Sequence, residues 1–170
     1  MTQQQINYLI ALPKLLDKNG ILNDTYTMIK QEPFQKRYTL KSPLNNRYTF
    51  LYNVDQSSKN YLKLTLHLMD NDTKIGLLRI DFNGQHQNPE NINDDVPNDF
   101  RPFAGKFFAY NEPHLHYYVK GYKPLSWAKP LSKDYPVQNI SSFSDVINAF
   151  IAFNSLISLK TNFIINPVIL

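Results

Sequence analysis

The sequence predicts an α+β fold in which two helices pack on an antiparallel sheet. Thr2 with Gln5 forms a capping box that starts a first helix. Ser142 with Asp145 forms the same motif near the C-terminus. Between them, residues 61–69 alternate strictly between apolar and polar side chains, which is typical of a strand with one buried face. We therefore expect a meander of four or five antiparallel strands, packed by an N-terminal and a C-terminal helix on its leucine face.

Each expected helix carries an apolar stripe. Ile6, Leu9 and Ile10 share one face of the first helix. Pro13 is expected to kink or end this helix, with Gly20 as its final stop. The stripe of the second helix consists of Phe143, Val146, Ile147 and Phe150.

Further strand patterns surround the 61–69 segment. Residues 47–54 are rich in aromatic and β-branched side chains, and residues 75–82 return after a turn at 71–73. Another strand starts near residue 114. Residues 163–169 are apolar and β-branched, which indicates a final edge strand.

The leucines of the 61–69 segment predict a register with the strand that follows. A register that pairs Leu66 with Leu78 keeps the apolar side chains together. It also places Lys63 beside Asp81, as an opposite-charge pair across the ladder. The leucines expected to be buried are Leu62, Leu64, Leu66 and Leu68.

Composition restricts the classes of protein and of function. The chain has no cysteine, which excludes disulfides, thiolate metal sites and a cysteine nucleophile. No secretory signal and no apolar run of ~20 residues is visible, so we expect a soluble, cytoplasmic protein without membrane contact. We expect a single domain over residues 1–170, with a long loop or insertion at 83–113 that is rich in proline, asparagine and aspartate. The abundance of Asn, Ile, Lys, Tyr and Phe suggests the AT-rich genome of a bacterium or its phage.

The net charge of +4 is unevenly placed, with two basic stretches at residues 30–47 and 120–133. The second interleaves aromatic rings with cations, a composition that single-stranded nucleic acid favours. An alternative is that Trp127 anchors the core and the lysines form a solvated rim. The candidate nucleic-acid-binding residues are Lys120, Tyr122, Lys123, Trp127 and Lys129.

Histidines provide a second candidate site. His114 and His116 are two apart in an expected strand, so their side chains leave the same face. If this strand lies beside the 75–82 strand, the same face carries Arg79 and Asp81, and His86 follows that strand's end. We take His86, His114, His116 and Asp81 as candidate ligands of a divalent metal such as zinc, manganese or iron.

The same residues allow two other interpretations. His114 and His116, with Arg79 or Lys120 as the cation, could cleave a phosphodiester by metal-free acid–base chemistry. An ordinary hydrogen-bonded structural role also stays open, and His67 is expected to be a polar-face residue of this ordinary kind.

Five short motifs between Arg79 and Leu131 are the basis of a resemblance to other proteins. They are Arg79-Ile-Asp81, Gly84-Gln-His86-Gln-Asn88-Pro89, Pro113-His114-Leu-His116-Tyr-Tyr118, Gly121-Tyr122 and Trp127-Ala-Lys-Pro130-Leu131. Together they resemble a family of small, uncharacterised bacterial and prophage proteins. This sequence departs from that family by a longer insertion at residues 90–112. The resemblance implies a grouping and carries no function.

Three classes of function therefore follow from the sequence. The leading prediction is a nucleic-acid-binding or nucleic-acid-associated accessory protein of a bacterium or mobile element. The second is a small metal-dependent or histidine-based enzyme that cleaves phosphodiesters, and the third is a protein-binding module. Convergence of His114 and His116 with His86 would favour the enzyme over the other two classes.

Overall fold

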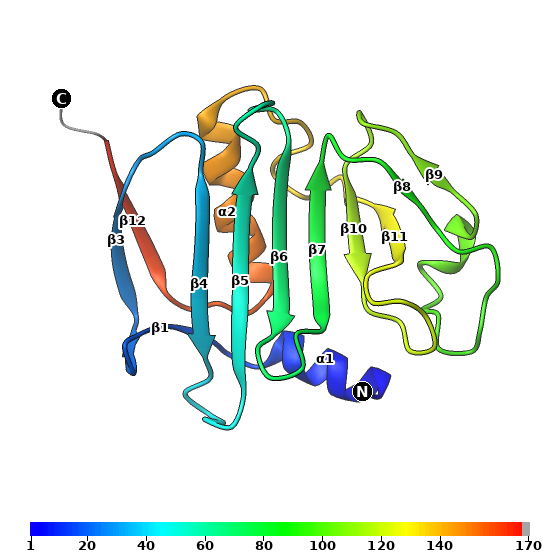
Figure 1. Cartoon of the computed structure of the whole chain (residues 1–170), viewed down its shortest axis with the longest axis horizontal. Helices are drawn as coiled ribbons and strands as arrows, with labels where there is room; N and C mark the ends of the chain where they lie inside the picture. The colour runs from blue at the N-terminus through cyan, green and yellow to red at the C-terminus, as the bar shows by residue number, and fades with distance from the viewer. Residues whose placement is uncertain (168–170) are drawn as a thin grey trace.

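A computed structural model describes residues 1–167, which fold into an α+β arrangement of two helices and a large antiparallel sheet (Figure 1). The strands of this main sheet are β1 (Leu15–Lys18), β2 (Ile21–Asn23), β4 (Gln35–Lys41), β5 (Thr49–Gln56), β6 (Leu64–Asp70), β7 (Gly76–Phe82), β10 (His114–Tyr117) and β11 (Trp127–Pro130). Over this described range the sheet has eight strands in the order β11-β10-β7-β6-β5-β4-β1-β2. The expected number of four or five is wrong. The strands predicted at 47–54, 61–69, 75–82 and near 114 correspond to β5, β6, β7 and β10, whereas β1, β2 and β4 at one end and β11 at the other were not predicted.

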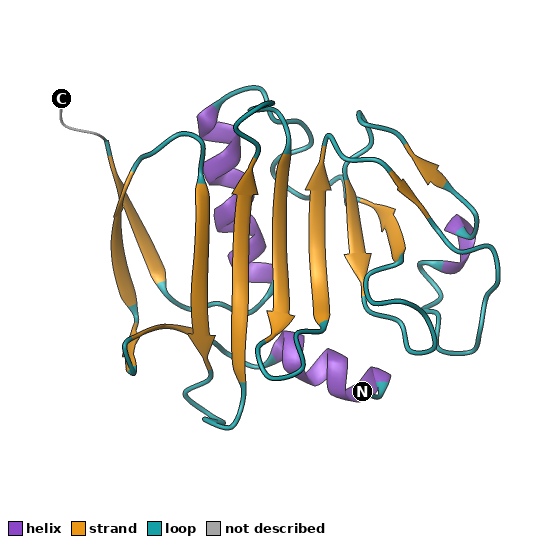
Figure 2. Ribbon diagram, in the orientation of Figure 1, coloured by secondary structure: helices purple, strands orange, loops and turns teal. Residues whose placement is uncertain are grey.

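The remaining elements lie around this sheet (Figure 2). They are the helices α1 (Gln3–Ala11) and α2 (Phe143–Leu156), the strands β3 (Thr25–Ile29), β8 (His86–Gln87), β9 (Phe107–Phe108) and β12 (Asn162–Asn166), and the short 3-10 helix η1 (Arg101–Phe103). The expected final strand starts at Asn162 and pairs in parallel with β3. The part of the expected 163–169 strand beyond residue 167 lies outside the described residues. The 83–113 segment is not only loop, since it contains β8, η1 and β9.

The helices begin as the sequence predicts. Both capping boxes are present, with Thr2 and Ser142 as the N-cap residues. The first helix ends at Ala11, before Pro13, because proline has no N–H to continue the backbone ladder. No helix in the described part of the chain is long and apolar enough to cross a membrane.

The sequence suggested that Gly20 is the final stop of the first helix, and this prediction is wrong. Gly20 instead lies in a hairpin. It follows Asn19 in the two-residue turn between β1 and β2, and both residues have a positive φ, 83° at Gly20 and 55° at Asn19. An Asn-Gly pair favours this mirror-image turn because both residues tolerate the left-handed region. The flanking strands, of four and three residues, were too short to show a period.

One face of the main sheet forms the core against α2 (Figure 1). Leu64, Leu66 and Leu68 are fully buried there, and Tyr52 of β5 stacks on Phe150 of α2 with ring centroids 5.7 Å apart. Leu62 breaks the prediction, with 48% of its surface exposed. The reason is that β6 begins only at Leu64, after a turn closed by the Lys63 N–H on the Asn60 carbonyl.

The register between β6 and β7 differs from the expected one by two residues. Leu66 lies opposite Ile80, and Asp81 therefore lies opposite Thr65 instead of Lys63. A β-bulge between Leu68 and Met69 accompanies this register. A slip of two residues keeps every side chain on its own face, so the apolar pattern could not distinguish the two registers.

The opposite face of the sheet is polar, and the register aligns its side chains in rows because residues directly opposite each other share a face. One row across β4, β5, β6, β7 and β10 contains Arg37, Asn53, His67, Arg79 and His116. The next row contains Gln35, Asp55, Thr65, Asp81 and His114. The pairing of β10 with β7 satisfies the condition on which the predicted histidine site depended.

Candidate metal centre

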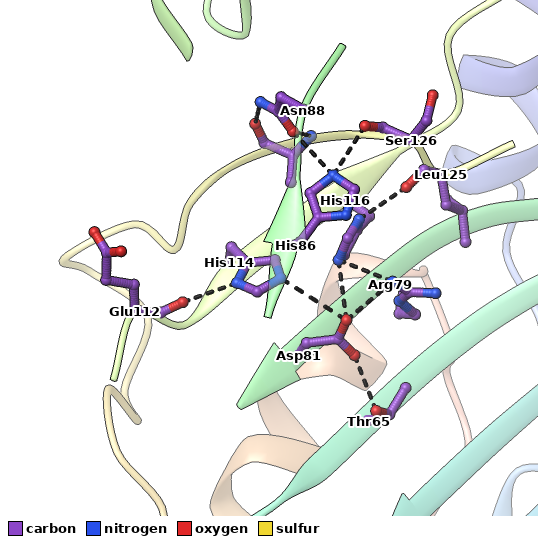
Figure 3. A network of polar contacts seen from close by, with 11 residues as sticks. Thr65, Arg79, Asp81, His86, Asn88, Glu112, His114, His116, Leu125 and Ser126 are labelled. Atoms are coloured by element: carbon purple, nitrogen blue, oxygen red, sulfur yellow. Dashed lines mark hydrogen bonds and ion pairs between the residues drawn. The ribbon is translucent and has the colours of Figure 1, made fainter. Parts of the chain in front are cut away.

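Three polar side chains converge where β7 and β10 lie side by side (Figure 3). His114 and His116 come from β10 and are fully buried, whereas 12% of the Asp81 side chain from β7 is exposed. The Oδ2 atom of Asp81 lies 3.0 Å from Nε2 of His116 and 3.8 Å from Nε2 of His114. One ligand atom from each residue lies within 4.8 Å of the other two.

Backbone carbonyls determine which nitrogen of each imidazole carries the proton. Nδ1 of His114 lies 2.8 Å from the Glu112 carbonyl, and Nδ1 of His116 lies 2.8 Å from the Leu125 carbonyl (Figure 3). A carbonyl only accepts hydrogen bonds, so each Nδ1 is the donor. In the neutral ring each Nε2 then carries a lone pair, and both lone pairs face the Asp81 carboxylate.

The centre keeps its histidines neutral and its carboxylate charged. Burial lowers the pKa of His116 to about 4, and it also lowers the pKa of His114. Burial acts to raise the pKa of Asp81, but the positive charge of Arg79 and the hydrogen bond from Thr65 favour the charged carboxylate, and that pKa lies below its usual range. Two neutral imidazoles and one carboxylate are the protonation states in which these groups bind metal ions.

Arg79 is the cation of the centre. Its Nη2 lies 3.0 Å from Oδ2 of Asp81 and 3.0 Å from Nε2 of His116, so one nitrogen donates to both groups. The Arg79 side chain is 30% exposed. His114 has no such donor, and in the part of the chain described here its buried Nε2 has no hydrogen-bond partner. A buried polar atom left unpaired costs about 1–3 kcal/mol.

His86 touches the centre without joining its ligand atoms. Its ring lies 4.4 Å from that of His116 and 5.8 Å from that of His114, centroid to centroid. Its Nε2 is within 2.9 Å of the Ser126 carbonyl and 3.0 Å of Oδ1 of Asn88, so that nitrogen donates to oxygen acceptors. The converging group of ligand atoms contains Asp81, His114 and His116, so the four-residue set predicted from the sequence is reduced to three.

Asn88, which the sequence marked only as part of a turn, fastens the 83–113 segment over the centre. Its Oδ1 accepts from the Ala128 N–H at 2.9 Å, and its Nδ2 donates to the Ala128 carbonyl at 2.7 Å. The side-chain amide therefore pairs with β11 as another strand would. Its Nδ2 also donates to the Phe103 carbonyl at 2.8 Å. This clamp holds the segment that carries His86 and Asn88 against Ala128 of β11.

Leu125 orients His116 and was not predicted at all. Its φ of 60° lies in the left-handed region, which is costly for a leucine. This conformation accompanies the hydrogen bond from Nδ1 of His116 to its carbonyl. The leucine side chain covers Gly76, where an added Cβ would lie 2.5 Å from Cδ1 of Leu125. A backbone carbonyl in an irregular segment leaves no signal in a sequence.

The residues proposed for nucleic-acid binding do not form an aromatic surface. Trp127 is fully buried in a small cluster with Phe100, so its ring has no exposed face on which a base could stack. The alternative that Trp127 anchors the core is therefore the better description. Tyr122 is half-buried against Trp127, and Lys129 forms an ion pair with Asp99.

Lys120 and Lys123 are exposed, but the two basic stretches lie apart. Residues 30–47 include β4, whereas residues 120–133 include β11 at the far edge of the main sheet. Strands β5, β6, β7 and β10 separate β4 from β11. The stretches therefore do not combine into one basic surface.

His67 is half-buried on the polar face, between Asn53 and Arg79 in its row. Burial and the nearby Arg79 charge lower its pKa to about 4. It is not one of the converging ligand atoms, which makes it a useful reference histidine for experiments on the centre.

Comparison with curated proteins gave no match, and comparison with solved structures gave none either. Residues 1–156 match the model of a family described as a family of unknown function, DUF6978. The matched range contains every residue of the candidate centre and of the clamp that covers it. The match agrees with the resemblance to an uncharacterised family that the sequence motifs carry, and the chain belongs to this family of unknown function, DUF6978.

Proposed function

We propose that Asp81, His114 and His116 bind a divalent metal ion, and that the chain is a metal-dependent enzyme acting on phosphodiesters. The observation that carries the proposal is the buried Nε2 of His114, which is directed at the Asp81 carboxylate and has no donor among the described residues. Nε2 of His67 is also buried without a partner, but it lies outside the converging ligand atoms, so the convergence with Asp81 and His116 is what distinguishes His114. A metal ion would use this lone pair together with that of His116, and it would displace the Arg79 guanidinium that donates to His116.

The two separations from the Asp81 oxygen suit a metal ion. Two ligand atoms bound at about 2.1 Å in tetrahedral geometry lie about 3.4 Å apart. The observed separations of 3.0 Å and 3.8 Å from Oδ2 of Asp81 bracket this value. The Nδ1–H bonds to carbonyls are the outer contacts that fix the orientation of metal-binding imidazoles. Three protein ligands leave a position open for water or substrate, as catalytic zinc, manganese and non-haem iron sites do.

Metal-free acid–base catalysis fits less well. A general acid must carry a proton at working pH, and the pKa of His116 is lowered by burial to about 4. The other nitrogen of each imidazole is committed to a carbonyl. At neutral pH neither His114 nor His116 is therefore suited to protonate a leaving group.

Arg79 has a place in the proposed reaction. Hydrolysis of a phosphodiester forms a bond from a water oxygen to phosphorus, breaks the bond to the leaving oxygen, and transfers a water proton to that oxygen. A bound divalent ion supplies Lewis acidity for this step. Because Arg79 is partly exposed beside Asp81, its guanidinium would stabilise the negative charge that develops on the phosphoryl oxygens.

Metal binding is the first test. Chain prepared without a histidine tag or chelator should contain near-stoichiometric metal by elemental analysis, and metal-stripped chain should bind zinc or manganese in calorimetry. His116→Ala should weaken binding by a factor of about 100 or more, whereas the matched control His67→Ala should keep it. No binding by the parent chain, or equal losses in both variants, would contradict the proposal.

A substitution of Arg79 tests metal binding and catalysis separately. Arg79→Met removes a positive charge close to the proposed ion, so it should tighten metal binding. The same variant should lower the rate of cleavage of a bis-aryl phosphodiester by about 10²–10³. A merely structural Arg79 would give weaker metal binding or unchanged hydrolysis.

A further inference from the structure

A hollow of about 570 Å³ lies on the polar face beside the candidate centre. Its volume is within the ~300–1,000 Å³ range of small-ligand sites. In Figure 1, α2 lies behind β4, β5 and β6, and the hollow lies over the opposite face of these strands. The lining residues used below are Gln35, Arg37, Asn53, Asp55, Thr65 and His67.

The hollow adjoins the centre directly. Thr65 and His67, which line it on β6, lie opposite Asp81 and Arg79 of β7. The hydroxyl of Thr65 donates to Oδ1 of Asp81 at 2.9 Å. No other strand separates the hollow from the centre, so a ligand held in the hollow extends toward Arg79 and Asp81.

The Arg37 guanidinium is the group of this face that an anionic ligand can contact, with Asp55 as the balancing charge in the lining. Arg37 donates through Nε to Oδ1 of Asn53 at 2.8 Å, which holds the guanidinium in place. Within residues 1–167 no carboxylate forms an ion pair with Arg37. The one carboxylate of the lining, Asp55, accepts from Nε2 of Gln35 at 3.2 Å.

The spacing of the two guanidinium groups indicates more than one phosphate. Arg37 and Arg79 belong to the same row and are separated by three strand spacings. At about 4.8 Å per spacing, they lie about 14 Å apart. A single phosphate cannot reach both, but a strand of nucleic acid carries phosphates at regular intervals. Asn53 and Thr65 lie between the two arginines and offer hydrogen bonds to the sugars.

We propose, building on the function proposed above, that this hollow binds a short stretch of single-stranded nucleic acid as the substrate. One phosphate pairs with Arg37, and the phosphate to be cleaved lies at Arg79 beside the metal. Among the described residues, no aromatic side chain lines the hollow, so we expect no contribution from base stacking. Binding is therefore independent of sequence and depends on phosphate contacts, which makes it sensitive to salt.

The test measures binding without metal, so that it does not depend on the metal centre. A fluorescein-labelled oligothymidylate of about eight nucleotides is titrated with chain in EDTA, from ~50 mM salt upward, and anisotropy is read. Two phosphate contacts predict a slope of log affinity against log salt near −1.4, since each contact on a single strand contributes about −0.7. No binding at the lowest salt would overturn the inference.

A matched pair of arginine variants locates the binding. Arg37→Gln should weaken binding about tenfold, as loss of one charge-assisted contact does, and reduce the slope by about 0.7. Arg47→Gln makes the same change of charge at an exposed arginine outside the hollow and should leave binding unchanged. Equal effects of both variants would overturn the inference. Both side chains are exposed, and thermal melts verify that the variants fold.

Two further ligands identify the substrate. Thymidine monophosphate should bind more weakly than the oligonucleotide, because it reaches only one arginine. Equal affinities, or tighter binding of a duplex of the same length, would overturn the assignment to single strands. Metal binding without oligonucleotide binding rejects the hollow alone. Oligonucleotide binding without any metal site rejects the proposed catalysis and leaves the binding surface standing.

Discussion

On the helix-covered face of the main sheet, Leu64, Leu66 and Leu68 are buried among apolar neighbours. On the opposite face of the same strand, Thr65 and His67 are half-buried and point toward the Asp81 centre. Apolar contact is non-directional, so the first face tolerates changes of register that preserve its side. The polar face depends on individual pairings, and a slip of two residues would replace Thr65 by Lys63 beside Asp81.

The polar face itself changes character along its length. Over β4 and β5 it is open, and Arg37 and Asp55 are exposed. Over β7 and β10 it is covered by the 83–113 segment, where Phe108 packs 4.7 Å from His114, centroid to centroid. The cover is what turns two polar-face histidines into buried groups with lowered pKa values. Burial of this kind makes chemistry possible in a way that an exposed row of the same residues does not.

The largest effect on stability is expected from a charge placed on the apolar face of the main sheet. Leu64→Asp should destabilise the fold by more than ~4 kcal/mol, because it buries an unpaired carboxylate. Denaturant unfolding measures the loss. The matched control is Leu62→Asp, two residues earlier in the same leucine series but 48% exposed, which should change stability by less than about 0.5 kcal/mol. Similar losses in the two variants would show that β6 begins earlier than Leu64.

These two leucines show what the sequence can and cannot predict of the fold. The alternation predicted the buried face correctly, because burial and period two are properties of the residues themselves. Where the strand begins depends on a turn at Asn60 whose hydrogen bonds compete with the ladder. The short β1–β2 hairpin was missed for a related reason, since three or four residues are too few to show a period.

The candidate site was predictable to a similar degree. His114 and His116 share a face in any strand, and Asp81 and Arg79 join them once β10 lies beside β7. The sequence could not give the tautomers, because these depend on the carbonyls of Glu112 and Leu125. Nor could it separate His86 from the ligands, since that depends on where the clamp at Asn88 holds its ring. The prediction that Trp127 binds nucleic acid was based on aromatic residues interleaved with cations, and that pattern does not distinguish a buried ring from an exposed one.

A second prediction uses pH to test how the polar face is buried. His67 has its pKa lowered by burial from 6.5 to about 4 in the folded chain. Between these values the unfolded chain binds a proton at this position and the folded chain does not, so stability rises with pH. As pH falls from 6.5 to 4, His67 should therefore cost up to about 3 kcal/mol.

The measurement for His67 is denaturant unfolding of the parent and of His67→Gln at a series of pH values. The variant should gain stability relative to the parent as pH falls through this window, and the difference should level off below about pH 4. At pH 7.5 and above the difference should be constant. A difference that does not change with pH would mean that His67 is open to solvent and that the covered part of the polar face ends at Arg79.

The smallest expected effect concerns the contact that covers this face at the start of β7. A Cβ at Gly76 would lie 2.5 Å from Cδ1 of Leu125 and 2.8 Å from Nε2 of His67. Gly76→Ala should therefore cost about 1–3 kcal/mol by overpacking, and it should displace Leu125. Because the Leu125 carbonyl accepts from Nδ1 of His116, the displacement should also weaken metal binding about tenfold. Gly20→Ala is the control: its φ of 83° strains an alanine and should also cost stability, but its Cβ would meet nothing within 4 Å, so metal affinity should stay unchanged. Calorimetry with zinc and unfolding by denaturant separate the two consequences. Lost stability with unchanged metal affinity would show that the Leu125 carbonyl does not orient His116, and that the covered face and the metal centre are independent of each other.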